Sequence, residues 1–172
     1  KKKKNYTINI FIYIIKMSRV IKKNTLSFSC SKSMKYLRTP PDIWQNLKNE
    51  FDFTCDMCAS DENHLLEKYY TAENSALDHD WNNEVGYIHP LFDGKIGKFV
   101  EKAYKSKGTF VFLLPASTHT KYFHEYFYNN PNVEIRFLRK PKDGFHFGND
   151  DGTTEKGLGY IKPLMICIMR NN

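Results

Sequence analysis

The sequence contains little cysteine and no long hydrophobic segment. Its 172 residues include four cysteines, at positions 30, 55, 58 and 167, which are too few and too scattered for a disulfide scaffold. The most apolar stretch, residues 8–15, includes Asn9 and is flanked by lysines, and it is far shorter than the roughly 20 residues needed to cross a bilayer. No small-residue cleavage site follows before Met17. We therefore expect an intracellular protein of a reducing compartment that does not contact a membrane.

Acidic residues are absent from the first 38 positions, which hold eleven of the 26 lysines and arginines. The remaining residues carry 15 bases and 19 acids, so the net charge of +7 arises in the N-terminal segment. We divide the chain into a basic extension, residues 1–35, and one domain, residues 36–172, which is long enough to bury a core. The extension is compatible with a solvated tail, with an arm that binds phosphate or docks a larger assembly, and with a leader upstream of a start at Met17.

Hydrophobic periodicity alternates between helix-like and strand-like segments after residue 40. The spacing predicts helices over residues 41–49, 60–66, 96–105 and 118–128, and strands over residues 51–56, 85–89, 109–114, 133–138 and 164–169. The run at 109–114 is almost continuously apolar, which is typical of a strand buried on both faces. Such alternation predicts a three-layer α/β fold around a mostly parallel sheet, in which ligands bind where the strands end.

Short motifs lie at three of these predicted strand ends, and two others precede a predicted helix or strand. In chain order they are Arg38-Thr39-Pro40-Pro41, Asp56-Met57-Cys58-Ala59-Ser60, Asp80-Trp81, His89-Pro90-Leu91-Phe92 and Leu113-Leu114-Pro115-Ala116. Taken together and in this order, they resemble the phage-type DNA N6-adenine methyltransferases, the Dam-like family, over about residues 36–170. The resemblance implies a Rossmann-like fold that binds S-adenosylmethionine and acts on DNA. It also leads us to expect a viral protein or a protein of the host cytoplasm.

The resemblance implies a cofactor site formed by Thr39, Pro40, Asp56, Ala59, Ser60 and Asp80. Thr39 and Pro40 would lie against the methionine part of S-adenosylmethionine, and Asp56 would help to hold it. A carboxylate suits that position because the cofactor presents an ammonium group and a sulfonium, both of them cationic. Asp80 would accept a hydrogen bond from the exocyclic amine of the cofactor's adenine.

His89-Pro90-Leu91-Phe92 occupies the place of the family's catalytic Asn-Pro-Pro-Tyr motif. In that motif the Asn oxygen and the first Pro carbonyl accept both amino hydrogens of a flipped-out adenine, and the aromatic ring stacks on the base. Pro90 keeps its carbonyl and Phe92 keeps the stacking face. His89 replaces the amide with an imidazole, which has a different reach and direction, and Leu91 replaces the second proline.

Two further departures lie near the expected reaction centre, because Ser117 stands where the family usually has Arg and His119 where it has Asp. The departures indicate a methyltransferase-like protein with impaired catalysis, so the sequence leaves open whether the chain is an enzyme. The alternative is a non-catalytic subunit of a nucleoprotein or viral assembly. RNA in place of DNA as the acceptor is a third hypothesis.

No metal site is predicted. Cys55 and Cys58 with His64 offer three ligands in a short spacing, whereas a structural zinc site needs four. Small buried hydrophobic side chains are the favoured interpretation of both cysteines.

Overall fold

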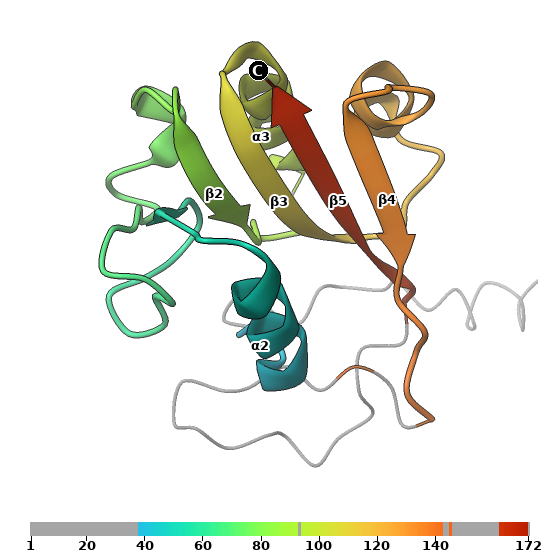
Figure 1. The fold of residues 1–172 in the computed structure, drawn as a ribbon, viewed down its shortest axis with the longest axis horizontal. Coiled ribbons are helices and arrows are strands. Elements are labelled where there is room, and N and C mark those ends of the chain that lie inside the picture. Colours follow the sequence, from blue (N-terminus) through green and yellow to red (C-terminus); the bar gives the residue numbers. More distant parts are fainter. Residues whose placement is uncertain (1–37, 93, 143–144, 146–161, 172) are drawn as a thin grey trace, which may run out of the picture. The chain divides into compact units, whose positions relative to one another are not determined.

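The computed structural model describes residues 38–92, 94–142, 145 and 162–171 (Figure 1). Within these ranges the helices are α2 (Pro41–Glu50) and α3 (Ile96–Lys105), with a 3-10 turn at Ala76–Asp78 and a π-helical turn at Phe123–Phe127. The strands are β1 (Cys55–Asp56), β2 (Glu84–Ile88), β3 (Gly108–Pro115), β4 (Val133–Phe137) and β5 (Leu164–Asn171). The expected N-terminal extension, residues 1–35, lies outside the described residues.

The strands form one sheet in the order β1-β2-β3-β5-β4 within the described part of the chain. The pairs β1–β2 and β2–β3 are parallel, whereas β5 is antiparallel to both β3 and β4. The predicted α/β fold is therefore confirmed as a mixed α/β fold. The predicted strand at residues 164–169 is β5. It lies between β3 and β4, which both run in the opposite direction, so it does not join the sheet in parallel as expected.

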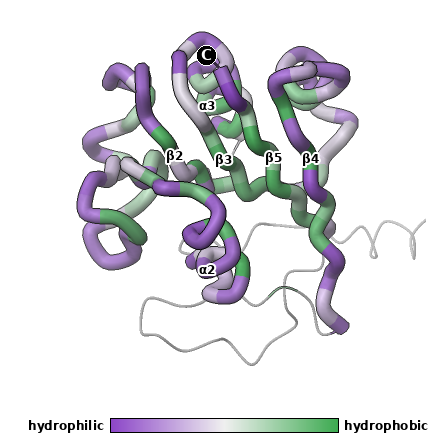
Figure 2. The backbone as a smooth tube through the Cα atoms, viewed as in Figure 1, coloured by the Kyte–Doolittle hydropathy of each residue, from purple (hydrophilic) through white to green (hydrophobic). Residues whose placement is uncertain are grey.

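Both faces of the sheet are covered, which explains the continuous apolar run in β3. Phe110, Phe112 and Leu114 point to the face covered by α3, where they join one core cluster. Val111 and Leu113 alternate with them and join a second cluster under α2. Figure 2 accordingly shows hydrophobic residues, in green, concentrated in the central strands.

Helix α2 starts at a position that its sequence determines. Pro41 occupies the first helical position, where no backbone N–H is required, and the Pro40 carbonyl accepts the N–H of Trp44 at 3.0 Å. Ile43 and Leu47 are buried against the sheet. Figure 1 shows α2 beside the edge at which the parallel strands end. The residues just before α2 are thereby brought to that edge.

The predicted helix at residues 60–66 is wrong, since the structure has turns there. The chain leaves β1 and returns beside it, with the N–H of Tyr70 bonded to the carbonyl of Asp56 at 2.9 Å. The loop closes a single turn, in which the Ser60 carbonyl accepts the N–H groups of Asn63 and His64, and the next N–H, that of Leu65, binds Asp56 instead of continuing a helix. The helix expected at 118–128 is also shorter, covering residues 121–127 with a π-helical turn.

Gly108 begins β3, and its backbone conformation requires glycine. Replacing Gly108 by alanine is expected to lower the free energy of unfolding by about 2–4 kcal/mol. The reason is that φ is +144° and an added Cβ would lie 2.5 Å from the Glu84 carbonyl oxygen. Gly94→Ala is the matched control, because φ is +92° there but nothing lies within 4 Å. Equal losses for the two variants in urea denaturation would contradict the steric cause.

Candidate active site

Thr39, just before α2, lies against residues of β2 and the segment that follows it. Its hydroxyl oxygen, Oγ1, is 2.7 Å from the hydroxyl of Tyr87 and 3.2 Å from Nδ1 of His89. Thr39 and Tyr87 are buried, and His89 is part-buried. Tyr87 and His89 share a side of the chain because alternate residues of a strand point to the same face.

Asp56 ends β1 and is buried, with 3% of its surface exposed. Its two carboxylate oxygens accept the backbone N–H groups of Cys58 at 3.3 Å and of Leu65 at 3.2 Å. Burial raises the pKa of Asp56 to about 6, although these two hydrogen bonds act in the opposite direction. The carboxyl group is therefore mainly ionised at pH 7 and titrates just below neutrality.

These predicted residues converge on one small cavity of about 30 Å³, which has room for ordered water. Its lining consists of Arg38, Thr39, Asp56, Cys58, Asn63, Leu65, Tyr87 and His89. The lining comes from the segment before α2, from β1 and the loop after it, and from β2 and the segment after it. Residues as distant in the sequence as Arg38 and His89 thus meet because the parallel strands β1 and β2 end at the same edge of the sheet.

His89 is a neutral imidazole at pH 7. Burial lowers its pKa to about 4. Its ring lies 5.7 Å from the ring of Phe92, centroid to centroid, at an interplanar angle of 56°. The two predicted catalytic side chains, His89 and Phe92, are therefore neighbours in the fold.

A second cavity of about 310 Å³ adjoins the first, and Cys58 lines both. Ala59 and Pro90, predicted at the cofactor and the target base, line this second cavity together with Asp78 and Lys95. Its volume is at the lower end of the range for sites that hold small organic ligands.

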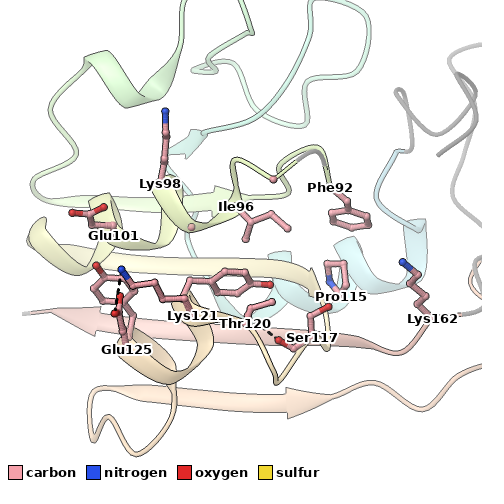
Figure 3. Close-up of a pocket in the computed structure, with 14 residues that line it drawn as sticks. Phe92, Ile96, Lys98, Glu101, Pro115, Ser117, Thr120, Lys121, Glu125 and Lys162 are labelled. Atoms are coloured by element: carbon pink, nitrogen blue, oxygen red, sulfur yellow. Dashed lines mark hydrogen bonds and ion pairs between the residues drawn. The ribbon is translucent and has the colours of Figure 1, made fainter. Parts of the chain in front are cut away.

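A third cavity, of about 470 Å³, lies between the start of α3 and the segment after β3 (Figure 3). In Figure 3, Phe92, Pro115 and Ser117 lie near one end of the cavity, whereas the ion pair between Lys121 and Glu125, 3.5 Å apart, lies at the other. Phe92 thus lines the same cavity as Ser117, one of the positions where the sequence departs from the expected motif.

Three predicted cofactor residues do not line these cavities. Asp80 is exposed, and its Oδ1 accepts hydrogen bonds from the backbone and side chain of Asn82 at 3.2 and 2.8 Å. It lies in a different surface depression, with Lys102. Ser60 caps the turn after β1 by accepting the N–H of Glu62 at 3.3 Å. Pro40 is buried at the start of α2.

Two residues of these cavities, Tyr87 and Asp78, were missed by reasoning from the sequence. The sequence pattern indicates that Tyr87 is a core residue of a strand. Its position two residues before His89 also indicates that the two side chains share a face. Asp78 lies two residues before Asp80, in the same acidic segment, and only the fold distinguishes them.

The described residues hold neither a metal-binding cluster nor a membrane-spanning helix. No group of three or more His, Cys, Asp or Glu side chains gathers there in a way that could hold a metal ion. Likewise, none of the helices in the described ranges is long and apolar enough to span a bilayer.

The chain is thus a mixed α/β domain with buried polar groups and cavities at the ends of its parallel strands, the place where α/β domains bind their ligands. A family model, DNA N-6-adenine-methyltransferase (Dam), matches residues 29–172. The chain therefore belongs to the Dam family, as the sequence motifs predicted. No curated protein matches the chain closely enough to count as a relative.

Asp56→Asn is expected to change how stability depends on pH. The pKa of Asp56 is raised from an ordinary 3.8 to about 6, so the folded chain binds this proton more tightly than the unfolded chain. This contribution favours folding fully below about pH 4 and is lost as pH rises through 6. Relative to the variant, the natural chain should lose about 2 kcal/mol of unfolding free energy between pH 4 and pH 7.

Urea denaturation across this pH range measures that difference. The comparison with the variant is needed because His89 acts in the opposite direction, since its lowered pKa removes stability as pH falls. Asp52→Asn, at an exposed position just before β1, is the matched control and should run parallel to the natural chain. A pH-independent difference between Asp56→Asn and the natural chain would contradict the raised pKa.

Proposed function

We propose that this chain binds S-adenosylmethionine in a Rossmann-like, three-layer domain and is a DNA N6-adenine methyltransferase-like protein whose transfer step is impaired. The observation that carries the proposal is the convergence of Thr39, Asp56 and His89 on one cavity, adjoining a larger one lined by Ala59 and Pro90. Membership of the Dam family supports DNA as the acceptor.

The chemistry of Asp56 fits the proposed cofactor. Its buried carboxylate accepts two backbone hydrogen bonds, and among the described residues it forms no ion pair with Lys or Arg. A buried carboxylate held by two backbone N–H groups is costly to ionise, and a cationic ligand group would offset that cost. S-adenosylmethionine carries such groups, and when bound it supplies an electrophilic methyl group.

Asp78 is better placed than Asp80 to accept a hydrogen bond from the cofactor's adenine. Asp78 lines the cavity of about 310 Å³ with Ala59 and Pro90. The carboxylate of Asp80 is instead engaged by Asn82, outside that cavity. The expectation for Asp80 and this reassignment to Asp78 make different predictions for single variants.

Calorimetry with S-adenosylmethionine tests the cofactor site. Asp56→Asn should weaken binding about tenfold to a hundredfold, because a charged partner of the cofactor is lost. Asp78→Asn should weaken it more than Asp80→Asn, and Asp52→Asn serves as the exposed control. For the natural chain, affinity should fall about tenfold per pH unit below pH 6 as Asp56 becomes protonated.

The absence of any heat with the natural chain would contradict the cofactor proposal. Together with the absence of methyl transfer to unmodified DNA, it would favour the alternative, a non-catalytic subunit of a nucleoprotein or viral assembly docked through residues 1–35.

The impaired step follows from two positions in the segment after β2. Holding the adenine amino group requires acceptors for both of its hydrogens, and Pro90 offers one of them as a backbone carbonyl. His89 offers an imidazole where the family has an amide oxygen. Leu91 is 41% exposed and does not restrict the backbone as a proline would.

His89→Asn with Leu91→Pro should restore methyl transfer, raising incorporation of labelled methyl into duplex DNA by about a hundredfold over the natural chain. Leu91→Pro alone is the matched control and should give a much smaller increase. An unchanged rate in the double variant, with cofactor binding retained, would show that these positions do not limit the reaction. Incorporation into RNA but not DNA would support the RNA hypothesis instead.

A further inference from the structure

The 3-10 turn Ala76–Asp78 has two of its carbonyl groups held by side chains. The indole Nε1 of Trp81 donates a hydrogen bond to the carbonyl of Ala76 at 2.7 Å. The ammonium group of Lys102 donates another to the carbonyl of Leu77, at 2.7 Å. Trp81 follows the turn closely in the sequence, whereas Lys102 belongs to α3. The turn is thereby fastened to that helix.

The side chain of Lys102 also contacts the ring to which the turn is bonded. Its Nζ lies 5.6 Å from the centroid of the Trp81 ring, which is within the range of a cation–π contact. Trp81 is buried, with 0% of its surface exposed, and Lys102 is half-buried. The ammonium group, the indole and the turn therefore form one connected unit.

A turn of this length depends on such contacts for its shape. Its own backbone bonds run from the N–H of Asp78 to the Ser75 carbonyl at 3.0 Å and from the N–H of His79 to the Ala76 carbonyl at 3.1 Å. Because a single isolated turn is unfavourable to form, contacts from the rest of the fold decide its conformation. The hydrogen bond from Lys102 is charge-assisted, and such bonds are about twice as strong as neutral ones.

We propose that Lys102 is a positioning residue, which holds the turn so that Asp78 lines the cavity of about 310 Å³ and on which ligand affinity in that cavity depends. Lys102 itself lines a different surface depression, so it acts through the turn and not by touching the ligand. The identity of the ligand rests on the proposed function. The fastening of the turn rests on the hydrogen bonds themselves.

Amide hydrogen exchange of the ligand-free full chain tests the fastening. Lys102→Met keeps the apolar stem but removes the donor, so the N–H of His79, which closes the turn, should exchange about tenfold faster. The N–H of Val111, buried in β3, is the reference for the whole fold and should not change in the same way. Unchanged exchange at His79, or equal acceleration at His79 and Val111, would overturn the proposal.

Calorimetry with S-adenosylmethionine tests the effect on the ligand. Lys102→Met should weaken binding about tenfold. Lys102→Arg retains a charged donor and should restore affinity to within about threefold of the natural chain. Lys105→Met is the matched control on the same helix and should change affinity by about twofold or less, because Lys105 is exposed and forms a surface ion pair with Glu101. Equal losses for Lys102→Met and Lys105→Met would contradict the positioning role.

A double-mutant cycle with Asp78→Asn shows whether Lys102 acts through Asp78. Once Asp78 is replaced, Lys102→Met should weaken binding by about twofold or less, since the group that Lys102 positions is gone. An undiminished loss in that background would overturn the proposal. The absence of heat with the natural chain would overturn the proposed function and, with it, the dependence of ligand affinity on Lys102, while hydrogen exchange would still decide whether Lys102 holds the turn.

Discussion

The buried carboxylate of Asp56 organises the polypeptide around the candidate site. One oxygen holds the backbone two residues further on and the other holds Leu65, so the loop after β1 is attached to the strand end from both sides. Ionised carboxylates are costly to bury, and two backbone donors only partly offset that cost, which explains the raised pKa. The loop conformation and the local negative charge therefore depend on the same group.

The polar groups around this carboxylate are connected with one another. Tyr87, Thr39 and His89 form a hydrogen-bonded chain on the same small cavity, and buried networks of this kind fix the donor and acceptor roles of their members. Replacing an amide by an imidazole at position 89 therefore changes the hydrogen-bonding groups of the side chain as well as its length and direction. Under the proposed function, an imidazole stands where the family offers an amide oxygen to the base, which provides a physical reason for impaired transfer.

Local patterns predicted some elements well and others poorly. Helices α2 and α3 and strand β3 were predicted almost to the residue, because each has a strong period or an unbroken apolar run. The helix expected at residues 60–66 failed because backbone groups there bind to Asp56 and to the edge of β1. The antiparallel direction of β5 was not predictable either, since an apolar strand buried on both faces has the same pattern in both directions.

The sequence by itself determined the family, the helices that flank the sheet, and the residues that end its parallel strands. The order of motifs and the hydrophobic periods are properties of the linear sequence, so they can be recognised without a structure. Only the tertiary structure decided that Thr39, Asp56 and His89 meet, that Tyr87 joins them, and that Asp78 rather than Asp80 lines the larger cavity. These contacts span up to 50 positions, and they depend on strand register and on loop paths, which no local pattern encodes.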